Sequence, residues 1–194
     1  MLTVREYSPA DLDAAVEVLS SAFVTNPLHL SAFGAERLDR NRFFFRVGLR
    51  HIFAGPAFVA VAGDEVLGYV HYSASPLCLP PPEAVPAFVA ERLRPLEDAV
   101  PHIIEWFSRW ARLDPDEPHS HLGPLGVFPE RQRRGVGSAL MSRYVEHLER
   151  DAMQGYLETD RPGNVEFYKQ FGFAVVREEQ LIGVPTWYMS RPRR

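Results

Sequence analysis

The stretch from residue 122 to residue 140, LGPLGVFPERQRRGVGSAL, constrains the fold of this chain more than any other. A strand-like apolar run ends at Pro129, an arginine-rich loop follows, and apolar residues then recur every four positions from Val136 to Leu148, which indicates a helix. The first N–H groups of such a helix have no intrahelical partner, and the helix dipole adds partial positive charge there. The sequence therefore predicts a strand–loop–helix unit that binds an anion, and phosphate is the simplest candidate.

The composition of this loop suits a pyrophosphate. Gly135 and Gly137 have no Cβ, so a bulky anion can approach the backbone amides closely. Arg131, Arg133 and Arg134 supply positive charge around it. The loop has neither the third glycine of the dinucleotide-binding fingerprint nor the Gly-Lys-Ser/Thr of a P-loop, so the motif by itself is a weak signal that needs context.

Length and charge limit the class of protein. A chain of 194 residues fits one domain with a sizeable core. The net charge is −4, and the arginines cluster in one loop and in the C-terminal tail, which argues against a nucleic-acid partner. One cysteine, Cys78, excludes an internal disulfide and indicates a reducing compartment. Without a signal-like start or an apolar run of ~18 residues, we expect a cytoplasmic protein with no membrane partner.

Hydrophobic periodicity predicts a mixed α/β fold. Alternating or apolar runs predict strands at residues 1–7, 57–62, 66–72, 119–127, 153–159, 174–179 and 186–190. Helical spacing predicts helices at residues 8–23, 36–53, 85–113, 136–151 and 163–171, the third in two pieces that meet near Pro101. A loop is expected to begin at Asn26-Pro27, and the proline-rich residues 73–86 should form a surface loop.

Two separated motifs, in the right order, are typical of one enzyme superfamily. The segment QRRGVG at residues 132–137 matches the Q/R-x-x-G-x-G/A signature of the GCN5-related N-acetyltransferases, or GNAT superfamily. The segment NVEFYKQFGF at residues 164–173 is similar to its N-x-x-F/A-Y-x-x-x-G-F segment. The chain thus resembles this superfamily over roughly residues 1–190. Residues 156–173, YLETDRPGNVEFYKQFGF, look most similar to its puromycin-acetyltransferase-like branch.

The resemblance implies a fold and a co-substrate. The fold would be a single GNAT-like α/β domain over residues 1–194, with a mixed, mostly antiparallel sheet of about seven strands and a helical insertion at about residues 74–115. The co-substrate would be acetyl-CoA, with its pyrophosphate on the amides of residues 133–138 and its pantetheine arm along the backbone of residues 125–127. We expect no metal. The expected cofactor-binding residues are Leu125, Gly126, Val127, Gln132, Arg133, Arg134, Gly135, Val136, Gly137, Ser138, Asn164 and Tyr168.

Acyl transfer to an amine requires a neutral amine, a donor to the carbonyl oxygen and a proton for the thiolate. The N–H of Val127 can be the donor. Tyr168 matches the superfamily's tyrosine acid, with Asn164 one helical turn earlier on the same face; the alternative is a packing tyrosine. For the general base, His121 and Glu158 are equal candidates, and an amine of low pKa would need neither.

The sequence does not identify the acceptor substrate. The leading hypothesis is direct transfer of an acetyl group from acetyl-CoA to a small-molecule amine. The alternatives are a CoA-binding sensor without turnover and a protein N-acetyltransferase, for which a wide, acidic cleft would be expected. Trp106 and the aromatic residues 43–45 could be packing residues or the wall of an acceptor site. A homodimer is also left open.

Overall fold

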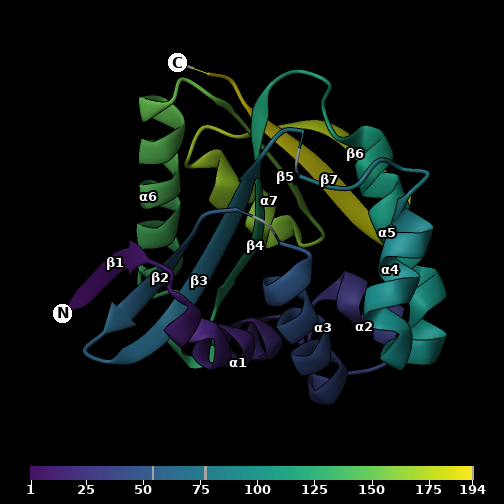
Figure 1. Ribbon diagram of the computed structural model, residues 1–194. Coiled ribbons are helices and arrows are strands. Elements are labelled where there is room, and N and C mark those ends of the chain that lie inside the picture. The colour runs from purple at the N-terminus through teal and green to yellow at the C-terminus, as the bar shows by residue number, and fades with distance from the viewer. Residues whose placement is uncertain (54, 77, 194) are drawn as a thin grey trace.

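The computed structural model describes residues 1–53, 55–76 and 78–193, and its centre is one seven-stranded sheet (Figure 1). The strand order is β1-β2-β3-β4-β5-β7-β6. The strands are β1 (Leu2–Glu6), β2 (Ala57–Ala62), β3 (Glu65–Ala74), β4 (His119–Val127), β5 (Gln154–Thr159), β6 (Ala174–Leu181) and β7 (Val184–Arg191). The described residues thus contain the seven strands that the sequence predicts, each within a few residues of its expected bounds.

Helices cover both faces of the sheet (Figure 1). They are α1 (Leu12–Phe23), α2 (Pro27–Phe33), α3 (Leu38–His51), α4 (Val85–Leu93), α5 (Val100–Leu113), α6 (Val136–Arg150) and α7 (Pro162–Lys169), with short 3₁₀ turns at Pro9–Asp11, Arg94–Ala99 and Pro129–Arg131. No helix among the described residues is both long enough and apolar enough to cross a bilayer.

Two hydrophobic clusters lie on the two faces of the sheet, and alternate side chains of β2 belong to one cluster or the other. Val59 and Val61 pack in the cluster with α1 to α5, whereas Phe58 and Ala60 pack in the cluster with α6 and α7. Successive side chains of a strand point to opposite faces. A strand buried on both sides is therefore apolar throughout, as the sequence of β2 is.

The sheet opens between β4 and β5, its one parallel pair. The ladder between them has three pairs and ends at His121↔Tyr156. Beyond that point β4 continues to Val127 beside β3, and β5 continues to Thr159 beside β7. Residues 122–127 and 157–159 therefore face each other across a wedge. Where two strands separate in this way, the strand edges become able to pair with backbone-like groups of a ligand, as exposed sheet edges do.

One local prediction was wrong. Asn26-Pro27 begins helix α2 instead of a loop: the Asn26 side chain accepts a hydrogen bond from the His29 N–H at 3.1 Å, and Pro27 occupies the first turn. This is a normal helix start, with a capping residue followed by proline. The helix predicted at residues 85–113 does form in two pieces that meet near Pro101. The break lies at residues 94–99, and Pro101 lies in the first turn of α5, where its missing N–H is tolerated.

Candidate active site

A cavity of about 130 Å³ lies at the open end of the wedge between β4 and β5. Its polar lining includes His121 from β4, Glu158 from β5, and Asn164 and Tyr168 from α7. Four residues that the sequence nominated, from three elements, therefore share one cavity. Leu125 lines it too, so the expected pantetheine strand reaches the same place.

Glu158 and His121 form a buried pair in this cavity. The Glu158 Oε2 lies 2.7 Å from the His121 Nε2, and the two side chains are 2% and 9% exposed. The other carboxylate oxygen, Oε1, is buried and has no hydrogen-bond partner among the described residues. Since a buried carboxylate oxygen without a partner is costly, this atom is suited to receive a donor from a ligand.

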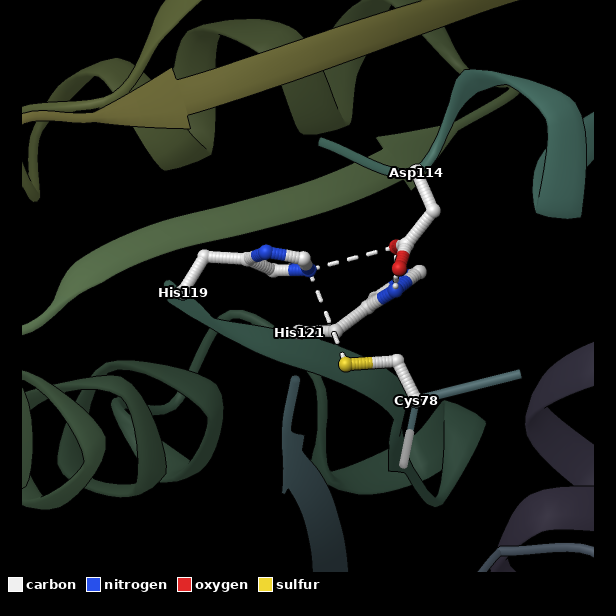
Figure 2. Close-up of side chains that lie close together, drawn as sticks. All are labelled: Cys78, Asp114, His119 and His121. Atoms are coloured by element: carbon white, nitrogen blue, oxygen red, sulfur yellow. Dashed lines mark hydrogen bonds and ion pairs between the residues drawn. The ribbon is translucent and has the colours of Figure 1, made fainter. Parts of the chain in front are cut away.

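His121 also belongs to a second group of side chains, which the sequence analysis did not connect. Its Nδ1 lies 3.0 Å from the Asp114 Oδ1, which is in turn 3.2 Å from the His119 Nε2 (Figure 2). The Cys78 sulfur lies 3.6 Å from the same His119 nitrogen. We call Cys78, Asp114, His119 and His121 the Cys-Asp-His cluster. Only the alternation of His119 and His121 along a strand could have pointed to it in the sequence.

The electrostatics of this cluster favour charged forms. Burial opposes protonation of His121, but the charge of Glu158 and a hydrogen bond to Asp114 outweigh it and raise its pKa well above the usual value. Burial likewise opposes ionisation of Asp114, yet hydrogen bonds from both histidines lower its pKa to about 2. The Cys78 thiol is also partly buried, and its hydrogen bonds to His119 and His121 lower its pKa to about 7.

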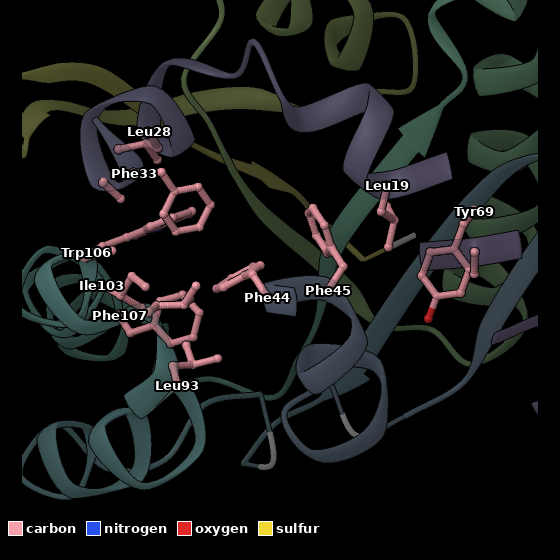
Figure 3. Packing of buried hydrophobic residues seen from close by; sticks show 14 of the residues in the cluster. Leu19, Leu28, Phe33, Phe44, Phe45, Tyr69, Leu93, Ile103, Trp106 and Phe107 are labelled. Carbon is pink, nitrogen blue, oxygen red and sulfur yellow. The ribbon is translucent and has the colours of Figure 1, made fainter. Parts of the chain in front are cut away.

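Aromatic side chains from α3 and α5 also line the cavity, and Figure 3 shows Phe44, Trp106 and Phe107 close together in the buried cluster. Trp106 from α5 stacks on Phe44 from α3 at 6.2 Å between ring centroids, and Trp110 stacks on Phe107 at 6.0 Å. The indole N–H groups of Trp106 and Trp110 are buried without a hydrogen-bond partner among the described residues. Trp106 is thus both a packing residue, 4% exposed, and part of the cavity wall.

Tyr168 is buried, and its hydroxyl has no hydrogen bond among the described residues. Burial raises the pKa of the phenol, so the hydroxyl keeps its proton at neutral pH. Asn164, four residues earlier, donates to the Thr159 hydroxyl at 3.1 Å and so joins the start of α7 to the end of β5. The predicted pairing of these residues on one helical face is confirmed, and both line the cavity.

The arginine-rich loop predicted to bind phosphate, residues 128–135, lies between β4 and α6. The side chain of Gln132 donates to the Val127 carbonyl at 3.1 Å, which ties the loop to the end of the strand. Gly135 precedes the helix with φ at 84°, a left-handed conformation that glycine adopts without strain. Arg133 and Arg134 are exposed beside it, and Gly137 lies in the first turn of α6. None of these loop residues lines the cavity. The charged loop and the cavity are therefore separate sites.

Strands β4 and β5 separate beyond His121, and the lined cavity lies where they separate. The model of the acetyltransferase (GNAT) family matches residues 24–173, and the chain belongs to this family. It is therefore an acetyl-CoA-dependent N-acetyltransferase, with acetyl-CoA as its co-substrate. The further likeness to the puromycin-acetyltransferase-like branch stays a prediction.

Solved structures support the fold. A histone acetyltransferase HPA2 and related acetyltransferase from Corynebacterium glutamicum is 22% identical with a TM-score of 0.73, covering 100% of this chain and 97% of that one. The ribosomal-protein-S18-alanine N-acetyltransferase from Escherichia coli is 14% identical, with a TM-score of 0.60 and coverage of 100% and 94%. A GNAT family acetyltransferase from Brucella melitensis, solved in complex with acetyl-CoA, is 15% identical, with a TM-score of 0.56 and coverage of 99% and 88%. At these identities the likeness concerns the fold.

Proposed function

We propose that this enzyme transfers the acetyl group of acetyl-CoA directly to the amine of a small molecule with an apolar or aromatic body. The observation that carries this proposal is the unpartnered Oε1 of Glu158 in a cavity whose other wall is aromatic. A carboxylate oxygen attracts an ammonium group, and indole and phenyl faces attract both cations and apolar carbon. Such a lining favours a compact amine over a protein chain.

The size of the cavity favours the same class of acceptor. An engineered apolar cavity of about 150 Å³ accommodates benzene, so a cavity of about 130 Å³ suits a body of similar size. Part of its wall comes from α5, through Trp106, Phe107 and Trp110, and α5 lies with α4 between β3 and β4 in the chain. We propose that residues 74–115 are the insertion expected from the sequence and that they limit the length of the acceptor.

On the donor side, the pyrophosphate of acetyl-CoA would bind the amides at the start of α6, which residues 133–138 provide. The pantetheine arm would pair with the backbone of Leu125, Gly126 and Val127 along the edge of β4 that β5 leaves. The acetyl group would then reach the cavity at Leu125. The Val127 N–H would donate to the thioester carbonyl oxygen as negative charge develops there.

The reaction then needs two proton transfers. The Glu158 Oε1 accepts a hydrogen bond from the acceptor amine and takes its proton, while His121 holds the other carboxylate oxygen in position. The amine nitrogen forms a bond with the acetyl carbon, and the bond from that carbon to sulfur breaks. Tyr168 donates a proton, or a strong hydrogen bond, to the departing thiolate. Of the two candidates for the general base, we thus assign Glu158 as the base and His121 as the residue that orients it.

The test is a screen of primary amines in which release of the CoA thiol is measured with wild-type enzyme and with Glu158→Gln. Gln keeps the shape of the side chain but cannot take a proton. We expect kcat to fall by about 10² to 10⁴ with an amine of high pKa and much less with one of low pKa, which reaches the site already neutral.

The matched control is Glu105→Gln, which changes an exposed carboxylate of α5 and should leave both rates unchanged. Equal losses with both amines in Glu158→Gln would mean that Glu158 only positions the acceptor. If no amine released thiol while acetyl-CoA bound tightly, the alternative of a CoA sensor would replace the small-molecule enzyme. Acetylation of peptides alone would favour the protein-acceptor alternative.

A further inference from the structure

The Cys-Asp-His cluster joins three segments that are distant along the chain. Cys78 lies in the proline-rich loop after β3, Asp114 follows the last residue of α5, and His119 and His121 alternate along β4 (Figure 2). Side chains two apart on a strand point to the same face. The two imidazoles therefore reach the cluster together, and the thiol and the carboxylate converge on them from two loops.

The spacing of the four donor atoms is that of a coordination shell. One atom from each side chain can be chosen so that all four lie within 4.8 Å of one another. The neighbouring pairs are 3.6 Å apart for the Cys78 sulfur and His119 Nε2, 3.2 Å for His119 Nε2 and Asp114 Oδ1, and 3.0 Å for His121 Nδ1 and Asp114 Oδ1. Ligands at about 2.0 to 2.3 Å from a tetrahedral zinc ion are roughly 3.3 to 3.6 Å apart.

The outer nitrogens of both imidazoles are held as they are in metal sites. The Nδ1 of His119 lies 2.9 Å from the Glu117 carbonyl oxygen, to which it can donate, and the Nε2 of His121 lies 2.7 Å from Glu158. A histidine that binds a metal usually donates its second N–H to a carbonyl or a carboxylate, which fixes the tautomer. Each histidine here has one nitrogen so held and the other directed at the cluster.

We propose that Cys78, Asp114, His119 and His121 bind one divalent transition metal ion, with zinc as the ion that suits them best. Thiolate, imidazole and carboxylate ligands in a tetrahedral arrangement are typical of zinc. One thiolate, one carboxylate and two neutral imidazoles also balance the charge of a divalent cation, so the buried site as a whole is neutral. Four protein ligands leave no open position, which makes the site structural.

The metal would join the two ends of the helical segment to the sheet. Cys78 precedes α4 and Asp114 follows α5, so both ends of the segment would be bonded to β4 through one ion. That segment carries Trp106 and Trp110, which line the cavity. The ion would therefore fix the aromatic wall relative to Glu158. This inference does not depend on which amine the enzyme acetylates.

Cobalt substitution tests the proposal directly. We would remove metal from the full-length protein with a chelator, add Co²⁺, and record the absorption spectrum during the titration. The expected result is one Co²⁺ per chain, with the intense visible bands of tetrahedral cobalt and a thiolate-to-cobalt charge-transfer band. Competition with Zn²⁺ should abolish these bands at one equivalent, and elemental analysis of the untreated protein should find close to one zinc per chain.

Variants separate the cluster from other metal-binding side chains. Cys78→Ser should remove the charge-transfer band, and His119→Ala should weaken Co²⁺ binding by about 100-fold or more, since even residues beyond the first ligands alter affinity by 10 to 100-fold. His102→Ala is the matched control, because His102 is exposed on α5 outside the cluster. It should bind Co²⁺ as the wild type does.

Thermal unfolding keeps the test valid if a variant is destabilised. Zn²⁺ should raise the Tm of the wild type and of His102→Ala, and it should not raise the Tm of a folded Cys78→Ser variant, folding being checked by circular dichroism. Failure to bind one equivalent of metal would overturn the proposal and leave the cluster a hydrogen-bonded network. Binding that survives in both Cys78→Ser and His119→Ala would overturn it as well.

Discussion

At the residue scale, three of the buried polar atoms without a hydrogen-bond partner among the described residues belong to side chains around one cavity. The Oε1 of Glu158 and the indole nitrogens of Trp106 and Trp110 are buried without hydrogen bonds among the described residues, and all three side chains line the same cavity. The large majority of buried polar groups in proteins are hydrogen-bonded. Three such exceptions around one cavity are expected of a site that completes its hydrogen bonds with a ligand.

Tyr168→Phe tests the acid. The ring keeps its packing and only the hydroxyl is lost, so the Kd for CoA should change little while kcat falls by about 10² to 10⁴. Steady-state kinetics with any amine that releases thiol, beside a CoA titration, measure both. Tyr144→Phe is the control: its hydroxyl donates to the Ser120 carbonyl at 2.8 Å outside the cavity. The Tyr144→Phe variant should be less stable than the wild type but should keep its kcat. A wild-type kcat in Tyr168→Phe would mean that Tyr168 is not the acid.

His29 predicts how stability depends on pH. Burial lowers its pKa to about 3, against about 6.5 in an unfolded chain, although its Nδ1 lies 2.7 Å from the Asn41 Oδ1. The unfolded chain therefore takes up a proton that the native state does not, and stability is lost as the pH falls from about 6.5 towards 3. Urea unfolding should show that the advantage of wild type over His29→Gln shrinks by about 2 to 3 kcal/mol between pH 6.5 and 4.5. A difference that stays constant with pH would contradict the low pKa of His29.

At the scale of the elements, β4 carries most of the functional groups because it changes partners along its length. Its first residues pair with both β3 and β5 and carry His119 and His121, whereas its last residues pair with β3 alone. The wedge that opens there exposes backbone amides of residues 125–127 on one edge. Helix α6 then begins after the loop and directs its unpaired N–H groups to the same end of the molecule.

Gly137→Asp tests the start of α6 as the phosphate site. A Cβ at Gly137 would meet the Phe167 ring at 3.5 Å, which is ordinary contact, so the variant should fold. Its carboxylate would repel the pyrophosphate, and calorimetry should show CoA binding weakened by at least about 100-fold. Ser142→Asp adds the same charge on the exposed face of α6 and should bind CoA normally. If a folded Gly137→Asp variant bound CoA with unchanged affinity, this loop would not be the phosphate site.

At the scale of the whole molecule, the proposed substrate sites draw on both faces of the sheet. Helix α6 packs with the hydrophobic cluster on one face, and Phe44, Trp106 and Phe107 belong to the cluster on the other face. The cavity beside the wedge is lined from both clusters, by Tyr168 from one and by Trp106 from the other. In the proposed function α6 would bind the phosphates of acetyl-CoA and α5 would select the acceptor, so the preference for the acceptor could change without loss of CoA binding.

Trp106→Phe tests this separation. The smaller ring enlarges the cavity and removes one unpaired N–H, so kcat/KM should rise for amines with bulkier bodies relative to smaller ones, while the Kd for CoA stays within about twofold. A panel of amines of graded size measures the ratio. Trp187→Phe is the control, because Trp187 packs against the other cluster and does not line the cavity. The same preference in both variants would mean that α5 does not select the acceptor.

Most of the strands and helices, and the family, could be predicted from the sequence. Alternation and four-residue periodicity fixed the strands and most helices, because burial of one face repeats with the period of the element. The spacing of Gln132, Gly135 and Gly137, and of Asn164 and Tyr168, identified the family, because a backbone anion site and a helical face are local structures. The helix at Pro27 was missed, although Asn26 and Pro27 are a capping pair, because a seven-residue helix is too short for periodicity to show.

Tertiary structure alone decided which distant side chains meet. Nothing local links Glu158 to His121, or Cys78 to Asp114 and His119, because these contacts depend on the pairing of β4 with β5 and on the return of the helical segment to the sheet. The same holds for Trp106, which falls beside the apolar stripe of its helix in the sequence and which the fold brings into the cavity wall. Sequence patterns record which face of an element is buried, whereas the identity of the partner across that face is set by long-range packing of the chain.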